Sequence, residues 1–176
     1  MKKKRPLLFC ALALLLVGLL GGCGSNKNLN PGSDIVFEGA DPPSANYGVS
    51  PPLPHLAYFV FSIRIDDPNL SLIASDAWTV DSADISYSVV SDPGHHLVGV
   101  PPARTEHIKA KVAPYTPTRS PVSMVEDGFL AENAAGFLGT TDTATVKVHL
   151  VFRAHRNKDG LPKVIRTNYF FNVGNY

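Results

Sequence analysis

The chain has 176 residues, with 16 Lys and Arg against 15 Asp and Glu, and a formal net charge of +1. This length is near the commonest size of a single domain and is enough for one hydrophobic core. The balanced charge excludes the strongly basic composition of nucleic-acid-binding proteins. We therefore expect one folded domain and no nucleic-acid partner.

The N-terminus has the layout of a bacterial secretory signal. Residues 2–5 are basic, and residues 6–20 are almost entirely apolar. That apolar run is shorter than the roughly 20 residues of a membrane-spanning helix, and Gly18, Gly21 and Gly22 end it early. The polar sequence after it carries no stop-transfer pattern. The sequence therefore predicts a cleaved signal peptide over residues 1–22 rather than a retained membrane anchor.

The sequence Leu20-Gly21-Gly22-Cys23 resembles the lipobox of bacterial lipoproteins. In that family an aliphatic residue stands three positions before the cysteine, and small residues fill the two positions between. The resemblance implies cleavage between Gly22 and Cys23 and attachment of diacylglycerol and palmitate-like chains to Cys23, whose sulfur is a good nucleophile. The alternative is a chance Gly-Gly-Cys after a plain signal peptide. Two or three acyl chains, at about 0.8 kcal/mol per buried methylene, make a long-lived membrane attachment.

Removal of residues 1–22 changes what the cysteines and the charge imply. Cys10 leaves with the signal peptide, so the mature chain has Cys23 alone and no intramolecular disulfide. Without the four basic residues 2–5, the mature chain keeps 12 Lys and Arg against 15 Asp and Glu, a charge of −3. Gly24 stands where many inner-membrane lipoproteins carry a retaining aspartate, which favours the outer membrane of the cell envelope.

Residues 23–33 are rich in glycine, serine and asparagine and are predicted to form a flexible tether. Residues 34–176 are predicted to form the domain. Apolar and polar residues alternate there, as in half-buried strands. The alternating runs lie at 58–65, 84–89, 107–112, 146–153 and 165–173, with two short candidates at 35–37 and 78–80.

The segments between these runs complete the fold prediction. Residues 157–160 read Asn-Lys-Asp-Gly, a strong turn signal that makes 146–173 a terminal hairpin. Residues 125–138 are predicted as a short helix across one end of the sheets. We predict an all-β fold, a single antiparallel β-sandwich of about seven strands, with a closed barrel as the alternative. Trp78 at the start of a strand and the closing hairpin are similar to immunoglobulin-like or fibronectin-type modules, without their cysteine pair.

The sequence contains no motif for catalysis or cofactor binding. Gly-x-Ser-x-Gly, Gly-x-x-x-x-Gly-Lys, His-Glu-x-x-His and Cys-x-x-Cys are all absent. We therefore expect no enzymatic activity, no cofactor and no bound metal. Three groups of polar residues could instead ligate a metal ion, although ordinary turn capping explains each of them as well. They are His95 with His96, Asp66 and Asp67 with Asn69, and Asn157 with Asp159.

Lys147, His149, Arg153 and His155 fall on one face of a predicted strand. The two histidines are about 20 Å apart along a strand, too far to ligate one ion. This set is either an ordinary solvated face or a basic interaction face. His107, Lys109 and Lys111 would extend it if the two strands share a sheet. An anionic glycan, a lipid headgroup or an acidic partner would suit such a face.

These observations leave two functional hypotheses. In the first, lipid on Cys23 holds a non-enzymatic β-sandwich at a membrane, where it docks to an envelope protein or a surface polymer. In the second, the domain binds a ligand or metal, or is an enzyme, through a site dispersed over loops. The candidate residues of that site are His55, Asp92, His95, Arg104 and Glu106. The missing catalytic motif favours the first hypothesis.

Overall fold

The computed structural model describes residues 33–49, 55–65, 69 and 71–176. The predicted cleavage between Gly22 and Cys23 and the lipid on Cys23 lie outside the described residues. The described part contains eight strands, one α-helix and one 3-10 turn. They are β1 (Asp34–Asp41), β2 (Ser44–Gly48), β3 (Leu56–Arg64), η1 (Ala74–Asp76), β4 (Trp78–Ser91), β5 (Arg104–Val112), β6 (Thr118–Ser123), α2 (Asp127–Phe137), β7 (Thr143–Arg156) and β8 (Pro162–Gly174).

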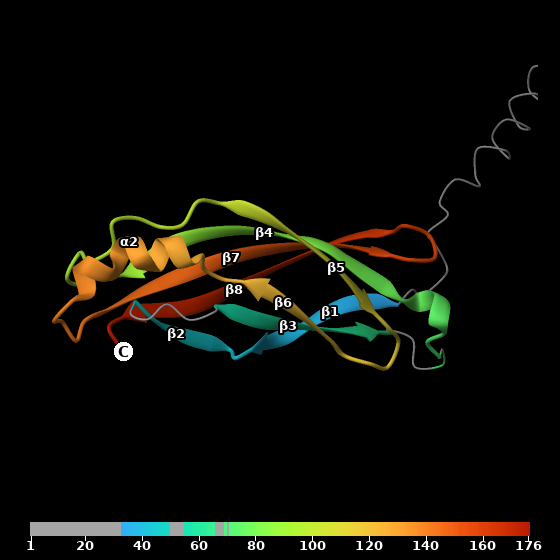
Figure 1. Ribbon diagram of the computed structural model, residues 1–176. Coiled ribbons are helices and arrows are strands. Elements are labelled where there is room, and N and C mark those ends of the chain that lie inside the picture. Colours follow the sequence, from blue (N-terminus) through green and yellow to red (C-terminus); the bar gives the residue numbers. More distant parts are fainter. Residues whose placement is uncertain (1–32, 50–54, 66–68, 70) are drawn as a thin grey trace, which may run out of the picture. The chain divides into compact units, whose positions relative to one another are not determined.

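The strands form two sheets (Figure 1). The smaller has the order β1-β3-β6 and the larger β2-β8-β7-β4-β5. β1 and β2 follow each other in the chain but lie in different sheets, so the chain changes sheets at Pro42 and Pro43. The chain also changes sheets between β5 and β6, through residues 113–117, where Ala113 and Thr116 form an isolated bridge.

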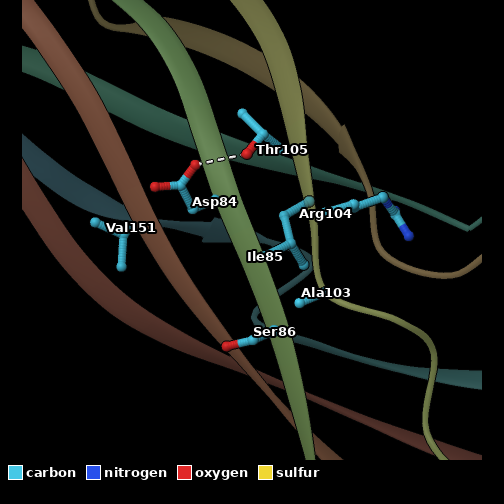
Figure 2. A pocket seen from close by; sticks show the side chains of 7 residues that line it. All are labelled: Asp84, Ile85, Ser86, Ala103, Arg104, Thr105 and Val151. Carbon is cyan, nitrogen blue, oxygen red and sulfur yellow. Dashed lines mark hydrogen bonds between the residues drawn. The ribbon is translucent and has the colours of Figure 1, made fainter.

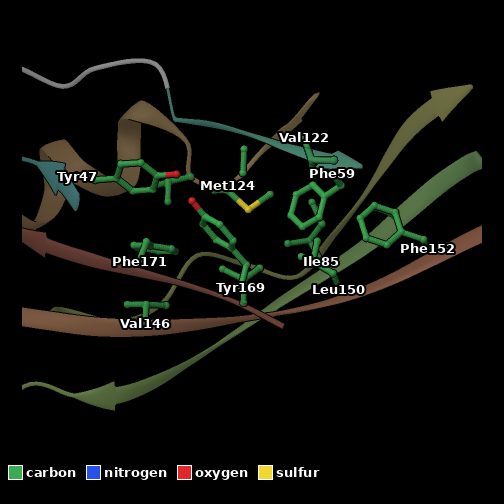
Figure 3. Close-up of a cluster of buried hydrophobic side chains, with 14 of the residues drawn as sticks. Tyr47, Phe59, Ile85, Val122, Met124, Val146, Leu150, Phe152, Tyr169 and Phe171 are labelled. Carbon is green, nitrogen blue, oxygen red and sulfur yellow. The ribbon is translucent and has the colours of Figure 1, made fainter. Parts of the chain in front are cut away.

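The inner faces of the two sheets share one hydrophobic core (Figure 3). Phe59 and Phe61 of β3 both pack on Phe152 of β7, with ring centroids 5.2 and 5.0 Å apart. All three side chains are fully buried. Removing a side chain of this size from water contributes about 1.5–3 kcal/mol. These three rings therefore hold the smaller sheet to the larger one.

α2 closes one end of this core (Figure 1). Phe129, Leu130 and Phe137 are buried, and so is the polar Asn133. The Asn133 side chain accepts a hydrogen bond from the backbone N–H of Val98 at 2.7 Å and donates one to the Phe129 carbonyl at 2.7 Å. The helix and the loop that follows β4 therefore pack as one unit.

The predicted all-β class, terminal hairpin and short helix are confirmed. About seven strands are predicted and eight are found, because β2 and β6 are missed while the predicted runs 78–80 and 84–89 form one strand, β4. The predicted antiparallel pairing is also wrong at one place, since β2 pairs with β8 in parallel. Two open sheets form rather than a closed barrel. β6 contains Pro121, which an edge strand tolerates because one of its sides needs no N–H donor.

The contact between α2 and the preceding loop gives a test of the fold. A Cβ added at Gly136 would lie 2.4 Å from the backbone oxygen of His96, whereas one at Gly128 would meet nothing within 4 Å. We expect Gly136→Ala to lower the free energy of unfolding by about 1–3 kcal/mol, because overpacking outweighs the gain in helix propensity. Gly128→Ala, the matched control, should leave it unchanged or raise it by up to about 1 kcal/mol. Urea unfolding of both variants measures this, and equal effects would contradict the packing described.

Candidate interaction site

The structure places the predicted interaction residues on the outer face of the larger sheet. Lys147, His149, Arg153 and His155 alternate along β7 with buried residues. β5 lies in the same sheet, separated from β7 by β4. Across the three strands, Lys111 of β5 is aligned with Thr79 of β4, which is aligned with His155. The strand that carries His107, Lys109 and Lys111 therefore shares a sheet with β7, as an extension of this face over β5 requires.

Two of the four residues are matched by carboxylates from β4. Arg153 donates to Asp84 at 2.7 Å, and the Nδ1 atom of His155 lies 2.8 Å from an oxygen of Asp81. Asp84 also accepts a hydrogen bond from the Thr105 hydroxyl at 2.8 Å. The bonds from Thr105 and Arg153 hold the pKa of the Asp84 carboxyl below its ordinary value.

The other two residues of the face also have neighbours on the sheet. The His149 ring lies between the Ser88 hydroxyl, at 3.1 Å, and the Asn168 side-chain oxygen, at 3.0 Å. The Lys147 ammonium lies over the ring of Phe170, 6.0 Å from its centroid. The face is thus a cross-strand polar network, and its use by a partner stays a prediction.

An open hollow of about 270 Å³ lies where β5 leaves β4 (Figure 2). It is lined by Asp84, Ile85, Ser86, Ala103, Arg104, Thr105 and Val151. The pairing of β4 with β5 ends at Ile85 and Arg104, and the chain before Ala103 turns away from β4. The Arg104 guanidinium donates to the Ser123 carbonyl at 2.5 Å and lies 3.6 Å from Glu126. The one Lys or Arg side chain that lines the hollow, Arg104, therefore has partners within the protein.

The residues of the second hypothesis make structural contacts, and two of them, Arg104 and Glu106, lie in β5 and both bond the backbone of Ser123. The Asp92 carboxylate accepts hydrogen bonds from the backbone N–H groups of His96 and Leu97, at 2.9 and 3.0 Å. Glu106 accepts one from the N–H of Ser123 at 3.2 Å. His95 has a φ of 51°, a turn conformation. Both carboxylates, Asp92 and Glu106, therefore serve as hydrogen-bond acceptors for backbone N–H groups.

The other candidate ligands also have partners. His96 lies 3.0 Å from Asp142 through its Nε2 atom. Asn157 accepts from the Thr79 hydroxyl at 2.8 Å, and Asp159 pairs with Arg156 at 2.5 Å. Asp66 and Asp67 lie outside the described residues. Within the described ranges, no three His, Cys, Asp or Glu side chains gather in a way that could hold a metal ion.

His55 is buried, and its carbonyl accepts a hydrogen bond from the N–H of Met124 at 2.7 Å. Its side chain is 3% exposed, and its ring centroid is 4.2 Å from that of Tyr47. Among the described residues, neither ring nitrogen of His55 has a hydrogen-bond partner. The buried hydroxyls of Tyr47 and Tyr169 influence each other's pKa as neighbours. Figure 3 shows these two hydroxyls pointing toward one another. Unpaired polar groups in a core reduce stability.

Burial sets the protonation of this cluster. It lowers the pKa of the His55 imidazole, with the charge of Asp127 acting in the opposite direction. Burial also raises the pKa values of the Tyr47 and Tyr169 hydroxyls. The alternation of 165–173 already predicts Tyr169 on the inner face. Tyr47 has no such signal, because β2 is too short to show a period.

Comparison of the chain with protein-family models, with curated proteins and with solved structures gives no match. In the part of the chain that the structure describes, no helix has the length and apolar character needed to cross a bilayer. A function must therefore be argued from the N-terminal sequence and from the surfaces of the domain.

The lowered pKa of His55 predicts a pH dependence of stability. Below pH 6.5, the unfolded chain binds a proton at this histidine that the folded chain does not bind. The free energy of unfolding should therefore fall as the pH drops from about 6.5 toward the lower folded-state pKa. We expect His55→Phe to remove this contribution, and the same change at the exposed His107 to keep it. Urea unfolding at pH 7.5 and 5.0 measures the difference, and an identical pH dependence in both variants would contradict it.

Proposed function

We propose that this protein is a bacterial envelope lipoprotein, cleaved before Cys23 and held to a membrane by lipid on that residue. The observation that carries the proposal is the sequence Leu20-Gly21-Gly22-Cys23 at the end of a basic and then apolar N-terminus. Cys23 is also the one cysteine of the predicted mature chain, so no disulfide competes for its thiol. Gly24 supports the outer membrane as the location.

We further propose that the β-domain is an interaction module rather than an enzyme. Asp92 and Glu106 accept hydrogen bonds from backbone N–H groups, and Asp159 accepts one from the Arg156 guanidinium, which supports a structural role for them. The two facing sheets support an immunoglobulin-like architecture, to which α2 and the parallel pair of β2 and β8 would be additions. The partner in this proposal is another envelope protein or a surface polymer.

The anchor is tested by Cys23→Ser in cells fed a labelled fatty acid. The wild-type protein should take up the label and fractionate with membranes, and Cys23→Ser should lose the label because serine offers no thiol. Cys10→Ser is the matched control and should stay labelled, because Cys10 lies within the signal peptide. Mass spectrometry of the mature N-terminus should find acylated Cys23. Labelling that persists in Cys23→Ser, or a mature chain beginning elsewhere, would refute the anchor.

A further inference from the structure

The two sides of β4 are paired to different lengths. On one side it pairs with β7 from Trp78, opposite Arg156, to Ser91, opposite Thr145. On the other side, pairing with β5 stops at Ile85. Residues 86–91 therefore have no strand on that side among the described residues, and we call this stretch the free edge of β4. Backbone N–H and C=O groups along such an edge can template another strand.

The free edge of β4 differs from the other sheet edges in what protects it. Proteins block strand addition with charges, prolines, bulges and short strands. The outermost strands here have such devices. They are Arg119 and Pro121 in β6, the bulge between Phe37 and Gly39 in β1, the five-residue length of β2, and Lys109 and Lys111 in β5. The free edge reads Ser-Tyr-Ser-Val-Val-Ser, without charge or proline, and has only an irregularity between Val89 and Ser91.

Apolar side chains are exposed along and beside this edge. Val89 is 45% exposed and Val90 57%. In the loop that follows β4, Val98 is 83% exposed and Val100 41%. Exposed apolar groups next to unpaired backbone indicate a surface that associates with another chain. The hollow at the fork between β4 and β5 begins at Ser86, the first residue of the free edge.

The charge around the free edge indicates what kind of partner chain would bind there. Residues 86–103 and 120–146 contain no lysine or arginine. Their acidic residues are Asp92, Glu126, Asp127, Glu132 and Asp142. A second hollow, of about 260 Å³, is lined by Val100, Pro101, Pro102, Gly128 and Phe129 together with Glu126 and Glu132. Two cations also adjoin this surface, Arg104, which lies 3.6 Å from Glu126, and Lys147, which is aligned with Ser88. The five acids outnumber them, and complementary charge selects and steers partners, so this end of the domain fits a basic, apolar segment.

The free edge lies far from the point where the described chain begins. The Ser33 hydroxyl donates to the carbonyl of Asp76, and the Trp78 indole N–H donates to the carbonyl of Ser33. The chain thus enters beside the first residue of β4, whereas the free edge ends at its last, Ser91. At 3.3 Å per residue, β4 separates the two by roughly 40 Å. Within the described domain, the free edge of β4 and Ser33 are therefore at opposite ends of this strand.

We propose that the free edge of β4 is a strand-addition site for a partner protein. The partner contributes an extended segment that alternates β-branched residues with lysine or arginine, and this segment continues the larger sheet beyond β4. Backbone hydrogen bonds supply affinity, and the acidic surroundings supply specificity. The inference deepens the proposed function and rests on it for the partner's place in the envelope.

The test uses the intact lipidated protein in detergent micelles and two labelled peptides. The probe is an acetylated, amidated Lys-Val-Lys-Val-Lys-Val, and its counterpart carries Glu in place of Lys. We expect the Lys-Val peptide to bind about tenfold more tightly than the Glu-Val peptide, by fluorescence anisotropy. Val90→Lys puts a like charge on the free edge and should weaken Lys-Val binding by about tenfold. Val164→Lys, at a similarly exposed site on β8, is the matched control and should bind like wild type.

Each other outcome overturns the inference. Equal affinity of the two peptides refutes the cationic partner, and equal affinity of Val90→Lys and wild type refutes the edge. A wild-type dimer that Val90→Lys dissociates, seen by sedimentation, assigns the edge to a second copy of this chain instead. Urea unfolding shows whether both variants fold. Failure here stays separate from failure of the anchor, because fatty-acid labelling of Cys23 reads the anchor alone.

Discussion

The pairing of β4, from Trp78 to Ser91, with residues 145–156 of β7 is the interaction on which the rest of the structure depends. It sends alternate residues of β7 into the core, where Phe152 contacts Phe59 and Phe61 of the other sheet. It also brings the acids of β4 beside the basic residues of β7 on the outer face. β5 follows β4 only to Ile85, so residues 86–91 lack a strand neighbour on that side. α2 contributes Phe129, Leu130 and Phe137 to the core at this end of the domain.

Much of this fold can be predicted from the sequence, because it depends on local periodicity. The alternation along 146–153 and 165–173 and the Asp-Gly turn predict the β7–β8 hairpin, and the short helix is predicted from its apolar content. β2 and β6 escape prediction for a physical reason. β2 has five residues and β6 contains a proline, so neither shows enough alternation to be distinguished from a loop. The parallel pairing of β2 depends on where the chain changes sheets, which no local pattern encodes.

The candidate site is predictable only in part. Period two places Lys147, His149, Arg153 and His155 on one face, as the structure has them. The carboxylate partners of Arg153 and His155 come from β4, with Asp84 69 residues from Arg153 and Asp81 74 residues from His155. Such pairs depend on strand order and register. Tertiary structure also decides that His55 is buried beside Tyr47 and that the β4–β5 pairing ends at Ile85. Neither feature can be predicted from a local sequence pattern.

The central structural claim is that residues 86–91 of β4 pair on one side only. Residue-resolved amide hydrogen exchange of the free protein tests this most directly. The account predicts protection of both alternating sets of amides in residues 79–85. In residues 86–91 it predicts protection of the amides that face β7 and fast exchange of those that face away. Slow exchange of every amide in residues 86–91 would mean that another segment pairs there, and would contradict the account.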